Sequence, residues 1–560
     1  MLPVKEIQER SDRHPKPSDI KFQYGTAGFR TLGKTLDSVL FRVGVLAALR
    51  SKKLDGKTIG VMVTASHNPE PDNGVKLVDP HGEMLESSWE AHATALANAH
   101  NSVAFIAAVD ELVKATKIDL SIPARVVYAR DTRPTGPQLV AALKDGLEAI
   151  KADYRDAGVT TTPVLHYLVR TINTKGTKDS YGEDTEEGYL TKMSDAFKKL
   201  LAGKPTPPPL LIDCANGVGA LMAERFKAYL GDIFDINLVN ADLHTPGALN
   251  NSCGADFVKV NQKLPPSITL QPGQRACSLD GDADRLIYYY ADERGQFHML
   301  DGDKITALVA SYIVELVKAS GLDKQIKVGV IQTAYANGSS TKYLSERLPV
   351  KCVPTGVKHL HHAAEQYDVG VYFEANGHGT VLFSPAAQEL ISSHIPSTAL
   401  TNLRNVIDVI NQTVGDALSD AFLVEAVLAH KSFSGMEWDS LYCDLPNRLV
   451  KVVVSDRNAF KTEDAERRLV SPPGLQARVD ELVRKYEGGR SFVRPSGTED
   501  VVRVYAEAAT RVEADGDTDS SYLLMIHSLS LSRLELAFRV AGLVYDEAGG
   551  DPSQKPNEFL

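Results

Sequence analysis

VMVTASHNPEPDNGVKL, from Val61 to Leu77, is an apolar run that breaks abruptly into a polar loop. Open α/β sheets place their chemistry in the loops that follow the carboxyl ends of strands. Because turn-forming residues follow the apolar run, we expect Ser66 and His67 to lie in such a loop, with Ser66 exposed at the strand end. A lone serine there would most often be an ordinary turn residue. The pattern therefore needs support from elsewhere in the chain.

That support comes from LDGDADR, Leu279 to Arg285, which carries carboxylates on Asp280, Asp282 and Asp284. At alternate positions of an extended loop, three such side chains would point the same way and gather oxygen ligands for a divalent cation. A solvated acidic turn is the alternative for this loop taken alone. Together with the first stretch, the loop predicts a serine that carries a phosphoryl group beside a metal ion.

An EF-hand calcium loop is excluded for the acidic stretch. Such a loop needs Gly at its sixth position and Glu at its twelfth. Counted from Asp280, these positions hold Arg285 and Ala291, and the segment that follows has the composition of a strand. Three carboxylates without a Glu suit Mg²⁺, which completes its octahedron with water or phosphate oxygens. A phosphorylated Ser66 would supply such an oxygen.

Composition indicates a globular protein of several domains. The 560 residues correspond to about four domains at roughly 150 residues each. Lys and Arg number 61 against 72 Asp and Glu, a formal net charge of −11. This balance argues against nucleic-acid or anionic-membrane binding, so we expect neither as a partner. An acidic protein that binds anions must gather its cations locally, and the Arg494 to Arg503 region is one candidate.

Cysteine usage and the amino terminus predict a cytoplasmic protein. The five cysteines are scattered, odd in number and without CxxC spacing, which favours reduced thiols. MLPVKEIQER lacks the apolar core of a signal peptide, and no apolar run approaches the length of about 18 residues that spans a membrane.

The chain repeats a strand–loop–helix pattern. Val126 to Ile150 predicts a strand, a turn at Arg133-Pro134 and an amphipathic helix. The proline cluster Pro205 to Pro209 predicts a linker, and a buried strand restarts after it. Residues 301–338 predict a helix followed by another strand. The last region differs, because it predicts strand–loop–strand and then a long helix.

Five motifs, in order along nearly the whole chain, resemble those of the α-D-phosphohexomutases, which include phosphoglucomutases, phosphomannomutases and phosphoacetylglucosamine mutases. They are YGTAGFR (Tyr24 to Arg30), TASHNP (Thr64 to Pro69), DGDADR (Asp280 to Arg285), FEANGHG (Phe373 to Gly379) and RPSGTED (Arg494 to Asp500). Within this family, Ala65 to Leu85 most resembles the eukaryotic phosphoacetylglucosamine mutases.

The resemblance implies an α/β fold of four domains around a central cleft. Three are related α/β domains with mixed sheets, and the smaller carboxyl-terminal domain is α+β. We expect residues 1–203 to carry the phosphoserine loop, 204–300 the metal loop, 301–450 the sugar-recognition loops and 451–560 the phosphate-binding loop.

The resemblance also assigns the chemistry. It implies a catalytic phosphoserine at Ser66, one Mg²⁺ per active site held by Asp280, Asp282, Asp284 and Ser66, and hexosamine 1,6-bisphosphate as activator. Three further residues are expected to be catalytic. Arg30 would screen phosphoryl charge, His67 would act as base or orient the loop, and Lys76 would be an active-site cation or a solvated strand-end lysine.

Substrate contacts follow from the remaining motifs. Arg285 would lock the metal loop or touch the phosphate. Glu374 can accept hydrogen bonds from two vicinal hydroxyls, and glycine lets the backbone approach a ring closely. The expected sugar contacts are Thr355, Gly356, Val357, Glu374, Asn376 and Gly377. An arginine beside hydroxyls and backbone N–H groups suits a phosphate; the expected phosphate contacts are Arg494, Ser496, Gly497, Thr498 and Arg503.

The implied activity is interconversion of N-acetylglucosamine 6-phosphate and N-acetylglucosamine 1-phosphate through a phosphoserine enzyme and a 1,6-bisphosphate intermediate, supplying UDP-N-acetylglucosamine biosynthesis. The small-molecule sugar phosphate would be the partner, and the protein would be a monomer. Three alternatives stay open. They are the same chemistry on glucose or mannose phosphates, a metal-dependent sugar phosphatase that hydrolyses its phosphoserine, and a non-catalytic sugar-binding protein.

Overall fold

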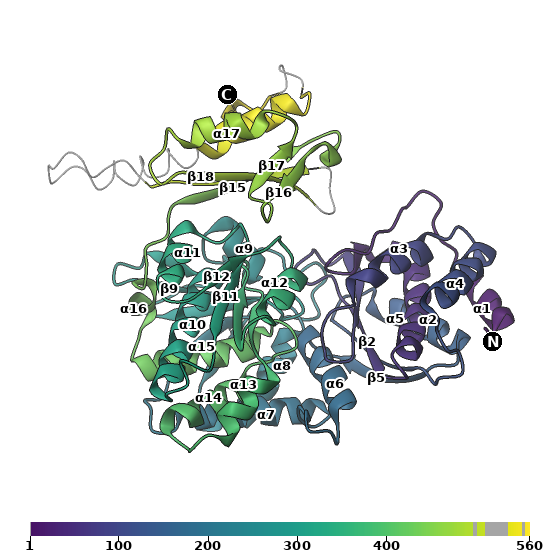
Figure 1. The fold of residues 1–560 in the computed structure, drawn as a ribbon, viewed down its shortest axis with the longest axis horizontal. Coiled ribbons are helices and arrows are strands. Elements are labelled where there is room, and N and C mark those ends of the chain that lie inside the picture. The colour runs from purple at the N-terminus through teal and green to yellow at the C-terminus, as the bar shows by residue number, and fades with distance from the viewer. Residues whose placement is uncertain (1, 497–500, 510–535, 551–554, 560) are drawn as a thin grey trace. The chain divides into compact units, whose positions relative to one another are not determined.

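The computed structural model describes residues 2–496, 501–509, 536–550 and 555–559. The chain divides into two units, and Figure 1 labels its helices and strands. The first comprises Met1–Ile326 and Asn376–Trp438, and the second comprises Lys327–Ala375 and Asp439–Leu560.

The first sheet of the first unit is mixed. Its order is β1-β3-β2-β4-β5, with antiparallel pairing along β1, β3 and β2 and parallel pairing along β2, β4 and β5. All six residues of β2 are buried, as an apolar run between two helical layers requires. The strands are β1 (Phe29–Leu32), β2 (Thr58–Val63), β3 (Asp72–Val78), β4 (Arg125–Arg130) and β5 (Asp153–Val159).

Helices cover both faces of this sheet. One large core takes side chains from five helices, and α6 (Thr162–Thr174) packs on the opposite face against Met62 and Val127. Helix α2 is buried along nearly its whole length, in keeping with its largely apolar sequence. The five helices are α1 (Val4–Ser11), α2 (Asp37–Lys53), α3 (Glu90–Asn98), α4 (Ser102–Thr116) and α5 (Gly136–Ala149).

The second sheet repeats the pattern of the first. Its order is β10-β9-β8-β6-β7, antiparallel along β10, β9 and β8 and parallel along β8, β6 and β7. This shared pairing confirms the expected kinship of the first two α/β domains. The strands are β6 (Leu210–Asp213), β7 (Ile236–Val239), β8 (Arg275–Leu279), β9 (Leu286–Ala291) and β10 (Phe297–Leu300).

Side chains alternate across this second sheet. Ala276 and Tyr289 pack in one core with α9, while Arg275 and Tyr288 reach Glu425 of α15. The remaining elements of the first unit are α7 (Glu186–Leu201), α8 (Gly219–Leu230), α9 (Gly254–Asn261), α10 (Gly302–Ala319), β14 (Gly379–Phe383), α13 (Pro385–Ser393), α14 (Thr398–Val409) and α15 (Ala417–Lys431), with α16 (Gly435–Asp439) at its end.

The second unit begins with a parallel arrangement in which β11 pairs with both β12 and β13. Helices connect consecutive strands, as parallel pairing requires. The elements are β11 (Val328–Gln332), α11 (Gly338–Ser345), β12 (Val350–Cys352), α12 (Val357–Ala364) and β13 (Val369–Phe373).

The carboxyl-terminal part of this unit is an antiparallel sheet β15-β19-β18 with a separate β16–β17 hairpin. The predicted strand–loop–strand is confirmed as β18 and β19, and the predicted long helix is helical over 536–547 where it is described. The elements are β15 (Asn447–Val453), β16 (Lys461–Glu463), β17 (Arg468–Ser471), α17 (Leu475–Val483), β18 (Arg490–Pro495) and β19 (Val501–Glu507).

Short 3₁₀ turns complete the chain: η1 (Gly33–Thr35), η2 (Ser87–Trp89), η3 (Gly231–Ile233), η4 (Arg457–Ala459) and η6 (Asn557–Phe559). None of the helices in the described ranges combines the length and apolar composition that a bilayer-spanning segment needs. The five cysteines are unpaired. Burial raises the pKa of the Cys277 thiol well above its usual range, which fits a structural rather than a reactive thiol.

Candidate active site

Ser66 lies three residues beyond the end of β2, in the loop that the sequence predicts. Its backbone adopts a left-handed conformation, φ +51°, and its N–H donates to Thr64 Oγ1 over 2.9 Å. Its hydroxyl donates to Asp280 Oδ2 over 2.6 Å. The expectation that Ser66 is exposed is wrong, because only 1% of the residue is accessible. The acidic loop, 214 residues away in sequence, covers it.

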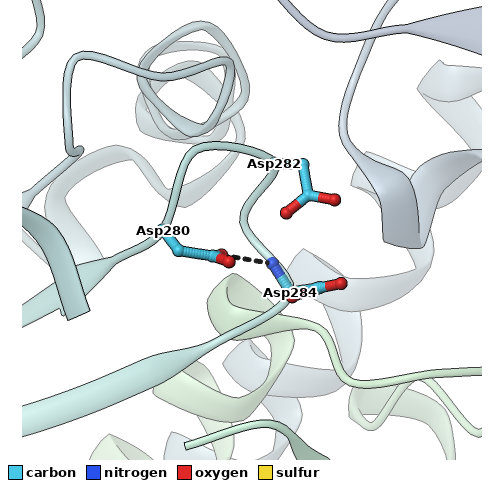
Figure 2. Close-up of side chains that lie close together, drawn as sticks. All are labelled: Asp280, Asp282 and Asp284. Atoms are coloured by element: carbon cyan, nitrogen blue, oxygen red, sulfur yellow. Dashed lines mark hydrogen bonds between the residues drawn. The ribbon is translucent and has the colours of Figure 1, made fainter. Parts of the chain in front are cut away.

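The acidic loop is a tight turn rather than an extended segment, so the stated reason for the convergence of its carboxylates is wrong. Ala283 has φ +61°, and its N–H donates to the carbonyl of Asp280. Asp280 Oδ1 also accepts hydrogen bonds from the N–H groups of Asp284 and Arg285. The turn brings the three aspartate side chains together, as Figure 2 shows.

The three aspartates fit a magnesium ion. One oxygen from each lies within 4.8 Å of the others, and all three residues are buried. Asp282 Oδ2 accepts a hydrogen bond from Thr162, but Asp282 Oδ1 is buried with no partner among the described residues. Burial, together with the charges of Asp284 and Asp282, raises the pKa of Asp280 well above its usual range. A cation bound by hard oxygen donors would relieve this crowding.

Basic side chains surround the carboxylates. Lys76 Nζ lies 3.2 Å from Asp284 Oδ2 and 3.4 Å from Asp282 Oδ2, so this lysine belongs to the cluster and is not a solvated strand end. Arg30 Nη1 donates to Asn68 Oδ1 in the serine loop over 3.3 Å. Arg285 Nε lies 3.8 Å from Asp280 Oδ2, which places this arginine against the metal loop.

His67 lies beside the serine hydroxyl, with Nδ1 3.5 Å from Ser66 Oγ. Burial lowers its pKa well below the usual range, and the positive charges of Arg285 and Arg30 lower it further. The imidazole is therefore neutral near pH 7. A neutral imidazole can take up a proton or hand it on.

The FEANGHG motif is divided between the two units. Glu374 lies in the second unit, whereas Asn376 and Gly377 lie in the first. Gly377 has φ +84°, and a Cβ there would meet the carbonyl oxygen of Leu286 at 2.0 Å, so only glycine fits beside the metal loop. His378, which the sequence reasoning missed, points its Nδ1 at the Asp284 carbonyl oxygen over 2.7 Å.

Two other residues that the sequence reasoning missed hold the serine loop. Arg133 Nη2 donates to the carbonyl oxygens of Ser66 and Asn68, each over 2.8 Å. Asn250 Nδ2 donates to the same two oxygens over 2.9 and 3.0 Å. Asp131 pairs with Arg133 and accepts a hydrogen bond from Thr64. The sequence signal for this arginine was the predicted turn at Arg133-Pro134.

The second unit holds most of the expected recognition residues. Arg494 and Arg503 face each other directly in the pairing of β18 with β19. Ser496 N–H donates to Val501 O over 2.9 Å and closes the base of the loop between these strands. Gly497 and Thr498 lie outside the described residues. Thr355 and Gly356 precede α12, which begins at Val357.

Four family profiles match the chain, one for each of domains I to IV. A profile described as phosphoglucomutase/phosphomannomutase α/β/α domain I matches residues 44–104 and 94–177. A profile described as the phosphoglucomutase/phosphomannomutase C-terminal domain matches residues 449–516. Profiles described as phosphoacetylglucosamine mutase AMG1 domain II and domain III match residues 180–287 and 301–433.

Individual proteins match over almost the whole chain. A phosphoacetylglucosamine mutase of Sus scrofa is 50% identical over 559 residues, covering 97% of both chains. The Aspergillus fumigatus N-acetylphosphoglucosamine mutase, solved with N-acetylglucosamine 6-phosphate and magnesium, is 50% identical with a TM-score of 0.91, covering 98% of this chain and 99% of that one. A second structure of the fungal enzyme, with glucose 1,6-bisphosphate, matches with the same identity, coverage and TM-score.

Proposed function

This chain belongs to the phosphoacetylglucosamine mutases of the α-D-phosphohexomutase superfamily, and we propose that it interconverts N-acetylglucosamine 6-phosphate and N-acetylglucosamine 1-phosphate through a phosphorylated Ser66. One observation carries the role of Ser66: its hydroxyl lies 2.6 Å from Asp280 within a buried set of three carboxylates. A hydroxyl in such a place can carry a phosphoryl group beside a divalent cation.

In the first transfer, a hydroxyl oxygen of the sugar phosphate forms a bond to the phosphorus on Ser66. The bond between that phosphorus and Ser66 Oγ breaks, and a sugar bisphosphate results. The proton lost by the sugar hydroxyl ends on Ser66 Oγ, and neutral His67 beside it is the candidate carrier. Lys76 and Arg30 would screen the charge of the moving group.

In the second transfer, the bisphosphate has turned over and gives its other phosphoryl group to Ser66. The enzyme is then phosphorylated again, and the sugar carries its phosphate at the other position. If the bisphosphate escapes, Ser66 stays unphosphorylated, so hexosamine 1,6-bisphosphate would act as an activator. Mg²⁺, held by Asp280, Asp282, Asp284 and the phosphorylated Ser66, would withdraw charge from the phosphoryl oxygens as a Lewis acid.

Recognition is assigned to the expected loops. Arg494 and Arg503 would bind the phosphate that is not reacting, together with Ser496, Gly497 and Thr498. Thr355, Gly356, Val357, Glu374, Asn376 and Gly377 would contact the sugar. The two arginines support this assignment, because an anion bound beside two like charges that face each other across paired strands would reduce their repulsion. We retain the domain bounds 1–203, 204–300, 301–450 and 451–560 as part of the proposal.

The test follows 1-phosphate and free phosphate formation with N-acetylglucosamine 6-phosphate, glucose 6-phosphate and mannose 6-phosphate. We expect the highest kcat/KM with the N-acetylated sugar and little free phosphate, because water must be excluded from a phosphoenzyme that transfers to sugar. Ser66→Ala should abolish turnover with an unchanged melting temperature. Equal kcat/KM for glucose 6-phosphate would demote the chain to a general phosphohexomutase, and stoichiometric free phosphate would indicate a phosphatase.

We also propose that the protein works as a monomer in the cytoplasm. Five cysteines without a disulfide suit a reducing compartment. Light scattering after size-exclusion chromatography should give the monomer mass of 60.8 kDa. A stable dimer, or fractionation away from cytoplasmic markers, would contradict this assignment.

A further inference from the structure

Glu466 occupies an unusual turn in the second unit. It lies in the hairpin between β16 and β17, where Asp464, Ala465 and Glu466 have φ of 51°, 53° and 67° in succession. Left-handed backbone is unfavourable for residues other than glycine and persists where the surroundings hold it. The contacts of Glu466 identify part of those surroundings.

The Glu466 carboxylate uses its two oxygens on two different loops. Oε1 forms an ion pair with Arg494 Nε at 3.2 Å, and both side chains are less than one-fifth accessible. Oε2 accepts a hydrogen bond from the Thr355 N–H over 2.9 Å. Arg494 is an expected phosphate ligand and Thr355 an expected sugar contact, so one carboxylate joins the two recognition loops.

The ion pair also bears on the electrostatics of the arginine pair. Arg494 and Arg503 are direct cross-strand partners, and the guanidinium of Arg494 lies 5.9 Å from the centre of the Tyr335 ring. Two like charges in this register repel each other. Glu466 supplies a negative charge beside them, and its contact is with Nε. A bidentate anion can use the terminal nitrogens of a guanidinium.

We propose that Glu466 is a positioning residue for phosphate recognition: it holds Arg494 from its Nε side and ties the Thr355 loop to the same carboxylate. This inference rests on the proposed function of Arg494. It implies that the phosphate and sugar contacts of the second unit are spaced before substrate arrives, which lowers the cost of ordering them on binding.

Glu466→Gln tests the charge and keeps the shape. The amide oxygen can still accept from Thr355 N–H, but the ion pair with Arg494 is lost. We expect KM for N-acetylglucosamine 6-phosphate to rise about tenfold while kcat stays within about twofold. The dissociation constant of inorganic phosphate, measured by calorimetry, should rise in parallel. Glu466→Ala, which loses both contacts, should raise KM further.

Glu463→Gln is the matched control, because Glu463 is an exposed glutamate in the same hairpin. It should leave KM, kcat and phosphate binding unchanged. Identical behaviour of the Glu466→Gln and Glu463→Gln enzymes would overturn the inference. Tighter phosphate binding by Glu466→Gln would also overturn it, because Glu466 would then be a competing anion. Absence of turnover in the unmodified enzyme would instead contradict the proposed function. The dissociation constant of inorganic phosphate would still test the positioning role of Glu466.

Discussion

Arg133 and Asp131 form an ion pair whose side chains are both fully buried, and the arginine uses its remaining N–H groups to hold the serine loop. Burying two charges costs free energy that good geometry and further hydrogen bonds must offset. Here the carbonyl oxygens of the serine loop accept these further hydrogen bonds from Arg133. The hydrogen bonds that help to offset the burial of the Arg133 charge therefore also fix the position of Ser66. A change in either residue should disturb the other.

Arg133→Met should lower the free energy of unfolding by on the order of 3–5 kcal/mol, because Asp131 would stay buried without a counter-charge. It should also reduce kcat, since Ser66 and Asn68 lose a shared donor. Lys175→Met is the control: Lys175 pairs with Asp184, but its side chain is 60% exposed, so the loss should be no more than about 1 kcal/mol. Denaturant unfolding followed by circular dichroism measures both. Similar losses in the two variants would contradict this account of the buried pair.

At the scale of elements, the crossing of α2 and α5 depends on glycine. A Cβ at Gly146 would meet the carbonyl oxygen of Phe41 at 2.0 Å, and a Cβ at Gly44 would meet that of Leu143 at 2.5 Å. The two helices can approach this closely only because both positions lack a side chain. Since α5 follows the strand and turn that carry Asp131 and Arg133, this packing fixes the segment behind the serine loop.

Gly146→Ala should lower stability by about 1–3 kcal/mol, because the backbones must move apart. Gly136→Ala lies on the same helix, where the nearest atom to a Cβ is the flexible Arg130 side chain at 3.2 Å. This control should change stability by less than about 1 kcal/mol. Thermal unfolding of the two variants compares their stabilities directly. Equal melting temperatures would refute the requirement for glycine at position 146, where α2 and α5 cross.

His14, in the amino-terminal segment, makes the stability of the folded protein depend on pH. His14 Nδ1 lies 2.7 Å from Asp37 and its Nε2 lies 3.3 Å from Asp145. Burial acts to lower the pKa of His14, but the two carboxylates outweigh it and raise the pKa above the ordinary value of 6.5. The protonated form is therefore favoured in the folded state. Its contribution is complete below pH 6.5 and is lost as the pH rises through the raised pKa.

His14→Gln should accordingly lower the melting temperature more at about pH 6 than at about pH 9. His81→Gln, a change at an exposed histidine, is the control for the substitution itself. Differential scanning calorimetry across this range gives the comparison. A larger loss for His14→Gln at the alkaline end would reverse the sign and contradict the assigned pairing.

At the scale of the whole molecule, chemistry and recognition are assigned largely to different units. Ser66, the three aspartates, Lys76 and His67 lie in the first unit, whereas Arg494, Arg503 and Thr355 lie in the second. Variants in the two units should therefore fail in different ways. Loss of metal ligation affects the transfer step, and loss of the arginines affects binding.

Asp282→Asn should reduce kcat strongly and leave the calorimetric affinity for N-acetylglucosamine 6-phosphate nearly unchanged. Arg494→Ala should weaken that affinity by on the order of 2–5 kcal/mol, whichever sugar phosphate is offered. Chelation of divalent cations should reproduce the first result in the unmodified enzyme, and added Mg²⁺ should reverse it. An Asp282→Asn enzyme that keeps full activity would contradict the assignment of Asp282 as a metal ligand.

The sequence by itself determined the strand that ends before Ser66, the acidic loop, the strand–loop–strand of the arginines, and the family. These features follow from local patterns, because alternation of apolar residues, turn-forming residues and short motifs act over a few positions. The choice of Mg²⁺ over an EF-hand calcium site likewise needed only a count along Asp280 to Ala291. The resemblance to the family then assigned the expected sugar-contact and phosphate-contact loops.

Only the tertiary structure decided the burial of Ser66, the turn that gathers the aspartates, and the roles of Arg133, Asn250 and His378. Each depends on a contact between segments far apart along the chain: Asn250 reaches a loop 184 residues earlier, and His378 a carbonyl 94 residues away. No local pattern encodes such contacts, because they arise when packed elements exclude water. Once water is excluded, buried carbonyls and charges must find partners within the protein.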